Sequence, residues 1–248
     1  MRFFAGLFAL FVLTAPALAA PTFPALSGRV MDNANILSDA TEFDLNNKLA
    51  ALEQKTSRQL VVVTLPSLQG YDISDYGYQL GRAWGIGQAK LNNGVVLIVA
   101  PKEHKARIEV GYGLEPILTD ALSSTILQSA VLPKFRQGDF DSGVEGGVDA
   151  LIQQLSLDTS AAEAKAAAAE QDAQQGNGQR GGFPGLLILL FILFAFFRVF
   201  GAWGFLPFLF MGGGGRGYGG TGGGWSGGGG GFSGGGGGFG GGGASGSW

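Results

Sequence analysis

The residues of this chain that could do chemistry carry oxygen rather than sulfur or imidazole. The chain has one histidine and no cysteine, which excludes disulfides, thiolate nucleophiles and cysteine metal ligands. His104 falls in a charged turn at 102–105, with no serine motif near it, so a Ser-His-Asp triad is not expected. The sequence also lacks the G-x-S-x-G, P-loop and H-E-x-x-H motifs.

Candidate polar ligands gather instead at the predicted ends of loops. They are Asp32, Asn35, Asn92, Asn93, Glu115, Asp120 and Asp139, together with Gly111 and Gly113, which flank a turn. A hard cation such as Ca²⁺ prefers several oxygen ligands, so these residues are candidates for a cation site. Asp and Asn also favour caps and turns because their side chains bond to the backbone, and this alternative stays open for each of them.

The strands that would position these residues are predicted by β-branched runs. Segment 59–65 is such a run and ends at Pro66, so it predicts a buried strand. Segment 94–100 predicts a second buried strand. Segment 106–110 alternates between apolar and polar residues, as a partly exposed strand does. The last two segments, separated by a short polar turn, predict an antiparallel hairpin.

Four helices are predicted by capping residues and helical spacing. Ser38 caps the first helix, over 39–56, and Asp72 caps the second. Thr119 caps a third helix, which we expect to end at Pro133, and Asp139 opens the fourth. The order of strands and helices predicts an α/β fold in which helices cover a sheet.

The N-terminus has the features of a secretory signal peptide. Arg2 precedes an apolar run, and an A-x-A tripeptide follows at 17–19. We predict cleavage after Ala19, so that residues 1–19 are the signal peptide. A soluble domain over 27–157 and a polar spacer over 158–182 then follow.

The C-terminal third combines an apolar segment with glycine repeats. Residues 183–206 predict a transmembrane helix, although Arg198 interrupts it, and a re-entrant pair of segments around 201–204 is the alternative. Residues 207–248 are rich in glycine, so we expect a disordered low-complexity tail. An exported domain followed by a single span places this tail in the cytoplasm.

Five segments and two glycines of the chain together resemble the TPM domain, which is shared by thylakoid lumen, photosystem II repair and acetylcholine-receptor accessory proteins. These are VMDNANILS, AWGIG, NNGVVLIVA, RIEVGYGLEPILTDA, LPKFRQGDF and the glycines at 143 and 147. The whole layout is similar to the bacterial membrane-anchored YgcG branch. The resemblance implies a three-layer α/β/α sandwich with a central mixed sheet.

The resemblance also implies where a metal would bind. The family's acidic cluster maps onto Asp32, Asn92 or Asn93, and Asp120. Many members carry Asp-Asn-Gly where this chain has Asn92-Asn93-Gly94. The missing carboxylate weakens the expectation of a divalent cation and of a metal-dependent phosphatase.

Three functions follow as expectations. The first is a non-enzymatic, periplasmic accessory module, anchored in the bacterial inner membrane, that binds a membrane or envelope protein. The second is a metal-assisted phosphatase in which Asp32 and Asp120 hold the cation. The third is a Ca²⁺-binding domain without catalysis. The net charge is −3 and no basic patch stands out, so we expect no nucleic-acid partner.

Overall fold

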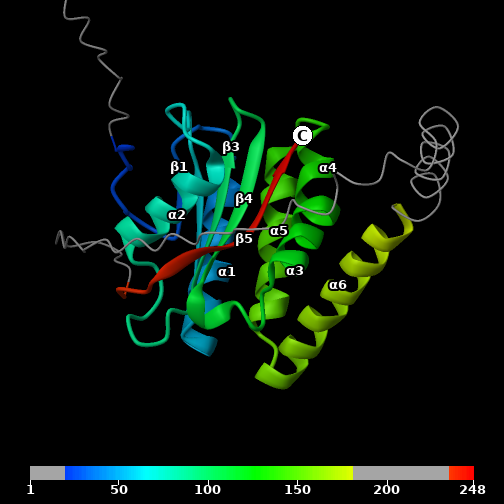
Figure 1. Cartoon of the computed structure of the whole chain (residues 1–248). Coiled ribbons are helices and arrows are strands. Elements are labelled where there is room, and N and C mark those ends of the chain that lie inside the picture. Colours follow the sequence, from blue (N-terminus) through cyan, green and yellow to red (C-terminus); the bar gives the residue numbers. More distant parts are fainter. Residues whose placement is uncertain (1–19, 181–234) are drawn as a thin grey trace, which may run out of the picture.

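The structure of the protein is a computed structural model that describes residues 20–180 and 235–248. The predicted signal peptide, the apolar segment and residues 207–234 of the glycine-rich tail lie outside the described residues. Figure 1 shows the described residues as a sheet with helices around it.

Five strands form one mixed sheet in the order β1-β2-β3-β4-β5. Their bounds are Val30–Asp32 (β1), Gln59–Thr64 (β2), Gly94–Ala100 (β3), Lys105–Gly111 (β4) and Phe239–Ser247 (β5). The first three are parallel to one another, and β4 and β5 each pair antiparallel with the preceding strand. The predicted antiparallel hairpin of β3 and β4 is therefore confirmed, and the predicted α/β class is confirmed as an α/β fold with a mixed sheet.

The helices follow from the capping residues seen in the sequence. They are α1 (Asp39–Thr56), α2 (Ile73–Trp84), α3 (Asp120–Ile126), α4 (Leu132–Phe135), α5 (Phe140–Leu155) and α6 (Thr159–Arg180), with a 3₁₀ turn at Tyr112–Leu114 and a π turn at Leu127–Val131. The side chains of Ser38, Asp72, Thr119 and Asp139 each accept a hydrogen bond from a backbone N–H of the first turn. All four predicted helix starts are confirmed.

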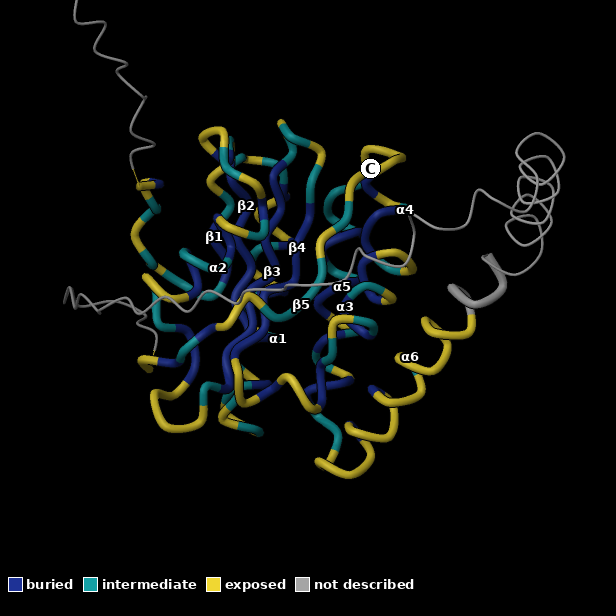
Figure 2. The backbone as a smooth tube through the Cα atoms, viewed as in Figure 1, coloured by how far each residue is buried: buried dark blue, intermediate teal, exposed yellow. Residues whose placement is uncertain are grey.

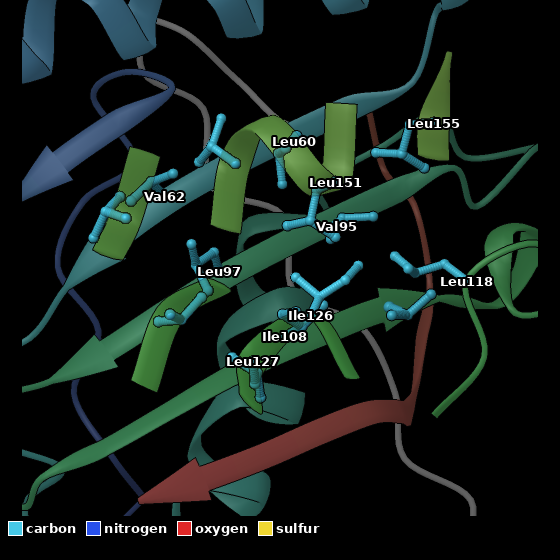
Figure 3. Packing of buried hydrophobic residues seen from close by; sticks show 14 of the residues in the cluster. Leu60, Val62, Val95, Leu97, Ile108, Leu118, Ile126, Leu127, Leu151 and Leu155 are labelled. Atoms are coloured by element: carbon cyan, nitrogen blue, oxygen red, sulfur yellow. The ribbon is translucent and has the colours of Figure 1, made fainter. Parts of the chain in front are cut away.

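Helices cover both faces of the sheet, and each face has its own apolar core. On one face, side chains of α1, α3 and α5 pack on alternate residues of the strands, such as Leu60, Val62 and Leu97. Figure 3 shows this packing around Leu151 and Leu155 of α5. On the other face, α2 packs on the residues between them, and Figure 2 shows β2, β3 and β4 as buried.

Three sequence expectations need correction in the main domain. The strand β1 was not predicted, because three residues are too few to show an alternating pattern. The third helix does not end at Pro133: a π turn over Leu127–Val131 leads into α4, which has this proline in its first turn, where no N–H is needed. Most of the predicted spacer is the helix α6, whose Ala162 and Ala166 are buried against the core.

The end of the glycine-rich tail is not disordered, contrary to our expectation. Residues Phe239–Ser247 form β5, which Figure 1 shows in red beside β4. The segment 235–238 also bonds to the turn that follows α2: Gly236 N–H donates to Gly85 O at 2.8 Å, and Ala89 N–H donates to Gly235 O at 2.7 Å. The C-terminal segment is thus part of the fold.

This pairing bears on the membrane arrangement. Among residues 20–180 and 235–248, no helix is both long and apolar enough to cross a membrane. Because β5 lies in the same sheet as β4, the domain and residues 235–248 must occupy the same side of any membrane. The predicted single span and its re-entrant alternative both concern residues outside the described ranges and stay predictions.

Candidate functional site

Asp32 lies at the carboxyl end of β1, where both of its oxygens stabilise the loop to α1. One oxygen accepts the Leu37 N–H at 2.9 Å, and the other accepts the Thr64 hydroxyl from the neighbouring strand. The same hydroxyl accepts the Ala34 N–H at 2.9 Å. Asn35 follows in the same loop with a φ of 53°. This geometry corresponds to the turn-forming role of Asp and Asn.

Acidic side chains surround this loop. Burial raises the pKa of Glu42, and the negative charges of Asp32 and Asp39 raise it further. Asp141, at the start of α5, accepts the Ser38 N–H at 2.9 Å. Among the described residues, no group of three or more His, Cys, Asp or Glu side chains is arranged to hold a metal ion.

Asn92 and Asn93 lie at the opposite end of the sheet, just before β3. Asn93 is buried and both groups of its side-chain amide are bonded, because its oxygen accepts the Gln88 N–H and its NH₂ donates to Ser57 O, both at 2.8 Å. Asn92 has a φ of 49°, and its side-chain oxygen accepts the Gly238 N–H at 2.8 Å. One asparagine therefore fixes the turn to the end of α1, and the other contacts the C-terminal segment.

Gly111 and Gly113 lie against the turn that contains Asn92. The Gly113 N–H donates to Asn92 O at 3.1 Å. A Cβ at Gly111 or Gly113 would collide with the backbone of residues 91–92, so only glycine permits this approach. Asp139 lies elsewhere, as the cap of α5, where hydrogen bonds from Ser142 lower its pKa.

Asp120 and Glu115 both contact β5. One oxygen of Asp120 accepts the Gly243 N–H at 2.6 Å. Glu115 lies against Gly242, where a Cβ would be 2.9 Å from its Oε1. Gly111 faces Phe239 in the β4–β5 ladder. Of the residues that the sequence offered as ligands at this edge, Gly111 is buried beside the end of the chain, whereas Glu115 and Asp120 contact it and stay exposed.

Asp32 and Asp120 cannot hold one cation. Asp32 is on β1, and Asp120 is bonded to β5, four strand spacings away in the sheet. At roughly 4.8 Å per spacing, this separates them by about 19 Å, whereas ligands of one Ca²⁺ each lie about 2.3–2.6 Å from the ion. The predicted metal set of Asp32, Asn93 and Asp120 is not brought together.

A buried ion pair next to β5 was missed by the sequence analysis. Arg107 and Glu109 on β4 are 4% and 0% exposed, and Arg107 Nε lies 2.5 Å from Glu109 Oε2. Arg107 also donates to Ser245 Oγ and to Gly241 O, each at 2.8 Å. The prediction that this strand is partly exposed was wrong, because α2 and β5 cover the side that carries the two charges.

The burial of this pair changes the acidity of its carboxyl group. Desolvation raises the pKa of Glu109 to about 7, although the positive charge of Arg107 opposes the shift. The Oε1 atom of Glu109 is buried and has no hydrogen-bond partner among the described residues. Two glycines of α2 make room for these neighbours. A Cβ at Gly77 would lie 3.1 Å from Arg107 Cδ of the ion pair, and a Cβ at Gly81 would lie 3.0 Å from the Phe239 ring of β5.

Aromatic side chains anchor both ends of the C-terminal strand. Phe239 is completely buried in the core beneath α2. Trp248, the last residue, packs on Phe135 and Phe140 with ring centroids 4.7 and 6.1 Å away, and on His104 at 5.7 Å. The sequence shows aromatic residues at intervals within the glycine repeats, but nothing in the repeats predicts where these residues would bind.

Two large apolar side chains near the start of the C-terminal strand are exposed. Leu91 is 55% exposed and Tyr112 is 51% exposed. Tyr112 N–H donates to Gly238 O at 3.3 Å, and the Tyr112 ring lies against Gly240. Among the described residues, the other large exposed hydrophobic side chain is Phe43, which is 72% exposed on α1.

Comparison with solved structures finds bacterial proteins determined by NMR, among them two N-terminal domains. A domain from P. gingivalis is 39% identical, with a TM-score of 0.49, and the match covers 52% of this chain and 83% of that one. The N-terminal domain of the cg2496 protein from Corynebacterium glutamicum is 19% identical (TM-score 0.42, 55% and 86% covered). The BA42 protein from Bizionia argentinensis is 23% identical (TM-score 0.43, 48% and 81% covered).

No curated protein matches the chain. The family model that matches is the TPM domain, named TPM_phosphatase, and it aligns with residues 30–154. This range runs from β1 nearly to the end of α5 and takes in Asp32, Asn92, Asn93 and Asp120. It contains the first four strands of the sheet, whereas β5 lies outside it. The chain belongs to the TPM domain family.

Proposed function

We propose that this protein is a non-enzymatic accessory module whose TPM domain binds a membrane or envelope protein outside the cytoplasm. The observation that carries the proposal is the exposure of two large apolar side chains, Leu91 and Tyr112, whose chain neighbours Asn92 and Gly113 are joined by a backbone hydrogen bond beside the start of β5. Exposed apolar side chains that lie together are a feature of protein-binding surfaces. The sheet edge next to them already binds an extended segment by backbone pairing, which is one of the general modes of peptide recognition.

The arrangement of polar residues supports binding over phosphatase chemistry. The carboxylate of Asp32 is used by the loop before α1, and that of Asp120 is used by Gly243. Their separation of about 19 Å, at roughly 4.8 Å per strand spacing, leaves no shared position for a cation that polarises a phosphoryl group. The phosphatase alternative would need a different set of residues from the one that the sequence suggested.

The proposed location is the periplasmic side of the inner membrane. It rests on the signal-peptide features of residues 1–19 and on the apolar character of 183–211. The docked β5 supports a re-entrant apolar segment, because that arrangement returns residues 235–248 to the side of the domain.

Site-specific photo-crosslinking in native membranes tests the binding proposal. A photoreactive residue is placed at Leu91 of the full chain, and the matched control carries it at Phe43, an exposed apolar position on another part of the surface. We expect a discrete adduct with a membrane or envelope protein from position 91 and none from position 43. Equal adduct patterns from both positions, or no adduct from position 91, would refute the proposal.

A hydrolysis assay tests the alternative. The full chain is incubated with a phosphate monoester and with Ca²⁺ or Mg²⁺, and compared with Asp32→Ala and Asp120→Ala. We expect no hydrolysis that depends on either residue. A loss of at least tenfold in Asp32→Ala would instead assign catalysis to the family's acidic position.

A further inference from the structure

The edge of β4 is shaped for one kind of strand. Along β5, added Cβ atoms at Gly240 and Gly243 would collide with Tyr112 and with Ile108 O, and one at Gly246 would lie 2.7 Å from Leu132 Cδ1. A strand of ordinary residues therefore cannot take the same path. The edge selects an extended segment that has glycine at these positions.

The two ends of the strand add a second requirement. The Phe239 ring fills a buried site over Gly81, and Trp248 fills a site formed by Phe135, Phe140 and His104. A matching segment must therefore place a phenylalanine and a tryptophan nine residues apart with glycine between them. The C-terminal segment of this chain, FGGGGASGSW, meets both requirements.

The contacts do not depend on which copy of the chain supplies the strand. Between Arg180 at the end of α6 and Gly235 lie residues 181–234. Even residues 207–234 alone, fully extended, reach up to about 90 Å at roughly 3.3 Å per residue, so the length of this stretch does not restrict the strand to its own domain. The hydrogen bonds of β5 to β4, to Arg107 and to Asp120 are the same when a neighbouring molecule supplies the strand.

We propose that β5 is an exchangeable strand, and that the β4 edge of one molecule also binds the C-terminal strand of a second copy of this chain. Exchange of an identical element between copies is a low-cost route to association, since no new contact has to be made. Association by this route grows with the local density of the protein, because the strand of a neighbour competes with the molecule's own. This proposal does not depend on the accessory function proposed above.

Disulfide trapping tests the proposal, because the chain has no cysteine of its own. Lys105 and Ser247 are partners in the β4–β5 ladder, and such cross-strand neighbours have Cα separations within the range that a disulfide can bridge. One full-length chain carries Lys105→Cys, and a differently tagged one carries Ser247→Cys. The two are co-expressed and then oxidised, so that a disulfide heterodimer forms only when the strand of one copy lies on the sheet of the other.

The expected result is a yield of heterodimer at least tenfold above that of a control mixture, in which Ser160→Cys, an exposed position on α6, replaces Ser247→Cys. Adding Phe239→Ala to the Ser247→Cys chain should reduce the yield to the control level. A chain with both Lys105→Cys and Ser247→Cys should close on itself when dilute and form linked dimers as its concentration rises.

Two results would overturn the proposal. If the doubly substituted chain closes on itself at every concentration and the mixture stays at the control level, β5 belongs permanently to its own domain. If the doubly substituted chain forms no disulfide of either kind, β5 does not pair with β4 in this register. Neither result bears on the Leu91 crosslink, so a failure here is distinguishable from a failure of the proposed function.

Discussion

Replacing Phe239 with alanine should release β5 from the sheet without unfolding the domain. The Phe239 side chain is fully buried against α2, and removing a buried phenylalanine side chain costs about 3–5 kcal/mol. Against this stands the backbone entropy of a strand that is mostly glycine, at roughly 1–2 kcal/mol per ordered residue. Because these two terms oppose each other, Phe239 supplies much of the net stability with which β5 is docked. The main core beneath α1, α3 and α5 does not include Phe239.

Hydrogen exchange of the full chain measures this release. In β4, alternate backbone amides face β3 and β5, because the strand is antiparallel to both neighbours. A loss of 3–5 kcal/mol corresponds to between about 100-fold and several thousand-fold, at about 1.4 kcal/mol per tenfold. We expect faster exchange by up to this factor in the amides of β4 that face β5, and unchanged exchange in those that face β3.

The control for this experiment is Phe43→Ala, which removes an exposed phenylalanine side chain from α1 and should change neither set of amides. Unchanged protection of β4 in Phe239→Ala would show that the phenylalanine is not an anchor. Equal loss of protection in β2 and β3 would show that β5 is part of the cooperative core. Either result would refute the reasoning that treats β5 as a separately docked strand.

Three further predictions follow from the same edge. The pKa of Glu109, about 7 in the fold against 4.5 ordinarily, means that the folded state binds more protons between these values. The free energy of unfolding should therefore fall by about 3 kcal/mol as pH rises from 4.5 to beyond 7, and denaturant titrations should show this slope flattened in Glu109→Gln. Gly243→Ala should release β5, because its φ of 118° disfavours alanine and its Cβ would strike a β4 carbonyl oxygen. Gly238→Ala, whose Cβ would lie 3.3 Å from a side-chain oxygen, should perturb β4 exchange far less. In intact cells, cysteines at Ser247 and at Ser160 should react with a membrane-impermeant maleimide from the same side, and labelling from opposite sides would contradict the docked strand.

Most of the main domain could be predicted because each element carries its own local signal. The helix α1 was predicted at its observed bounds from Ser38 and the spacing of leucines such as Leu45 and Leu49. The buried strands β2 and β3 followed from their β-branched runs. The helix α6 was missed, since the buried positions among its residues 159–175 are alanines, which leave almost no apolar pattern.

The candidate site could be predicted only in part, because its residues depend on contacts distant in the sequence. The family resemblance selected Asn92 and Asp120, and the structure shows that both bond to the C-terminal segment. The resemblance also selected Asp32, but strand order places it at the far side of the sheet. The buried pair of Arg107 and Glu109 followed from no local signal, since an alternating strand gives no indication of what covers its polar side.

The strand β5 shows how an absence of side chains can specify a binding partner. Strand prediction relies on alternating apolar side chains, whereas most positions of this strand have no side chain to alternate. Its fit comes from the edge it meets, where Tyr112 and the backbone of Ile108 leave no space for a Cβ. Glycine also loses the most backbone entropy on ordering, which keeps such a strand weakly bound. The same residue type therefore makes the pairing selective and easily released, so the strand's two aromatic anchors decide whether it stays.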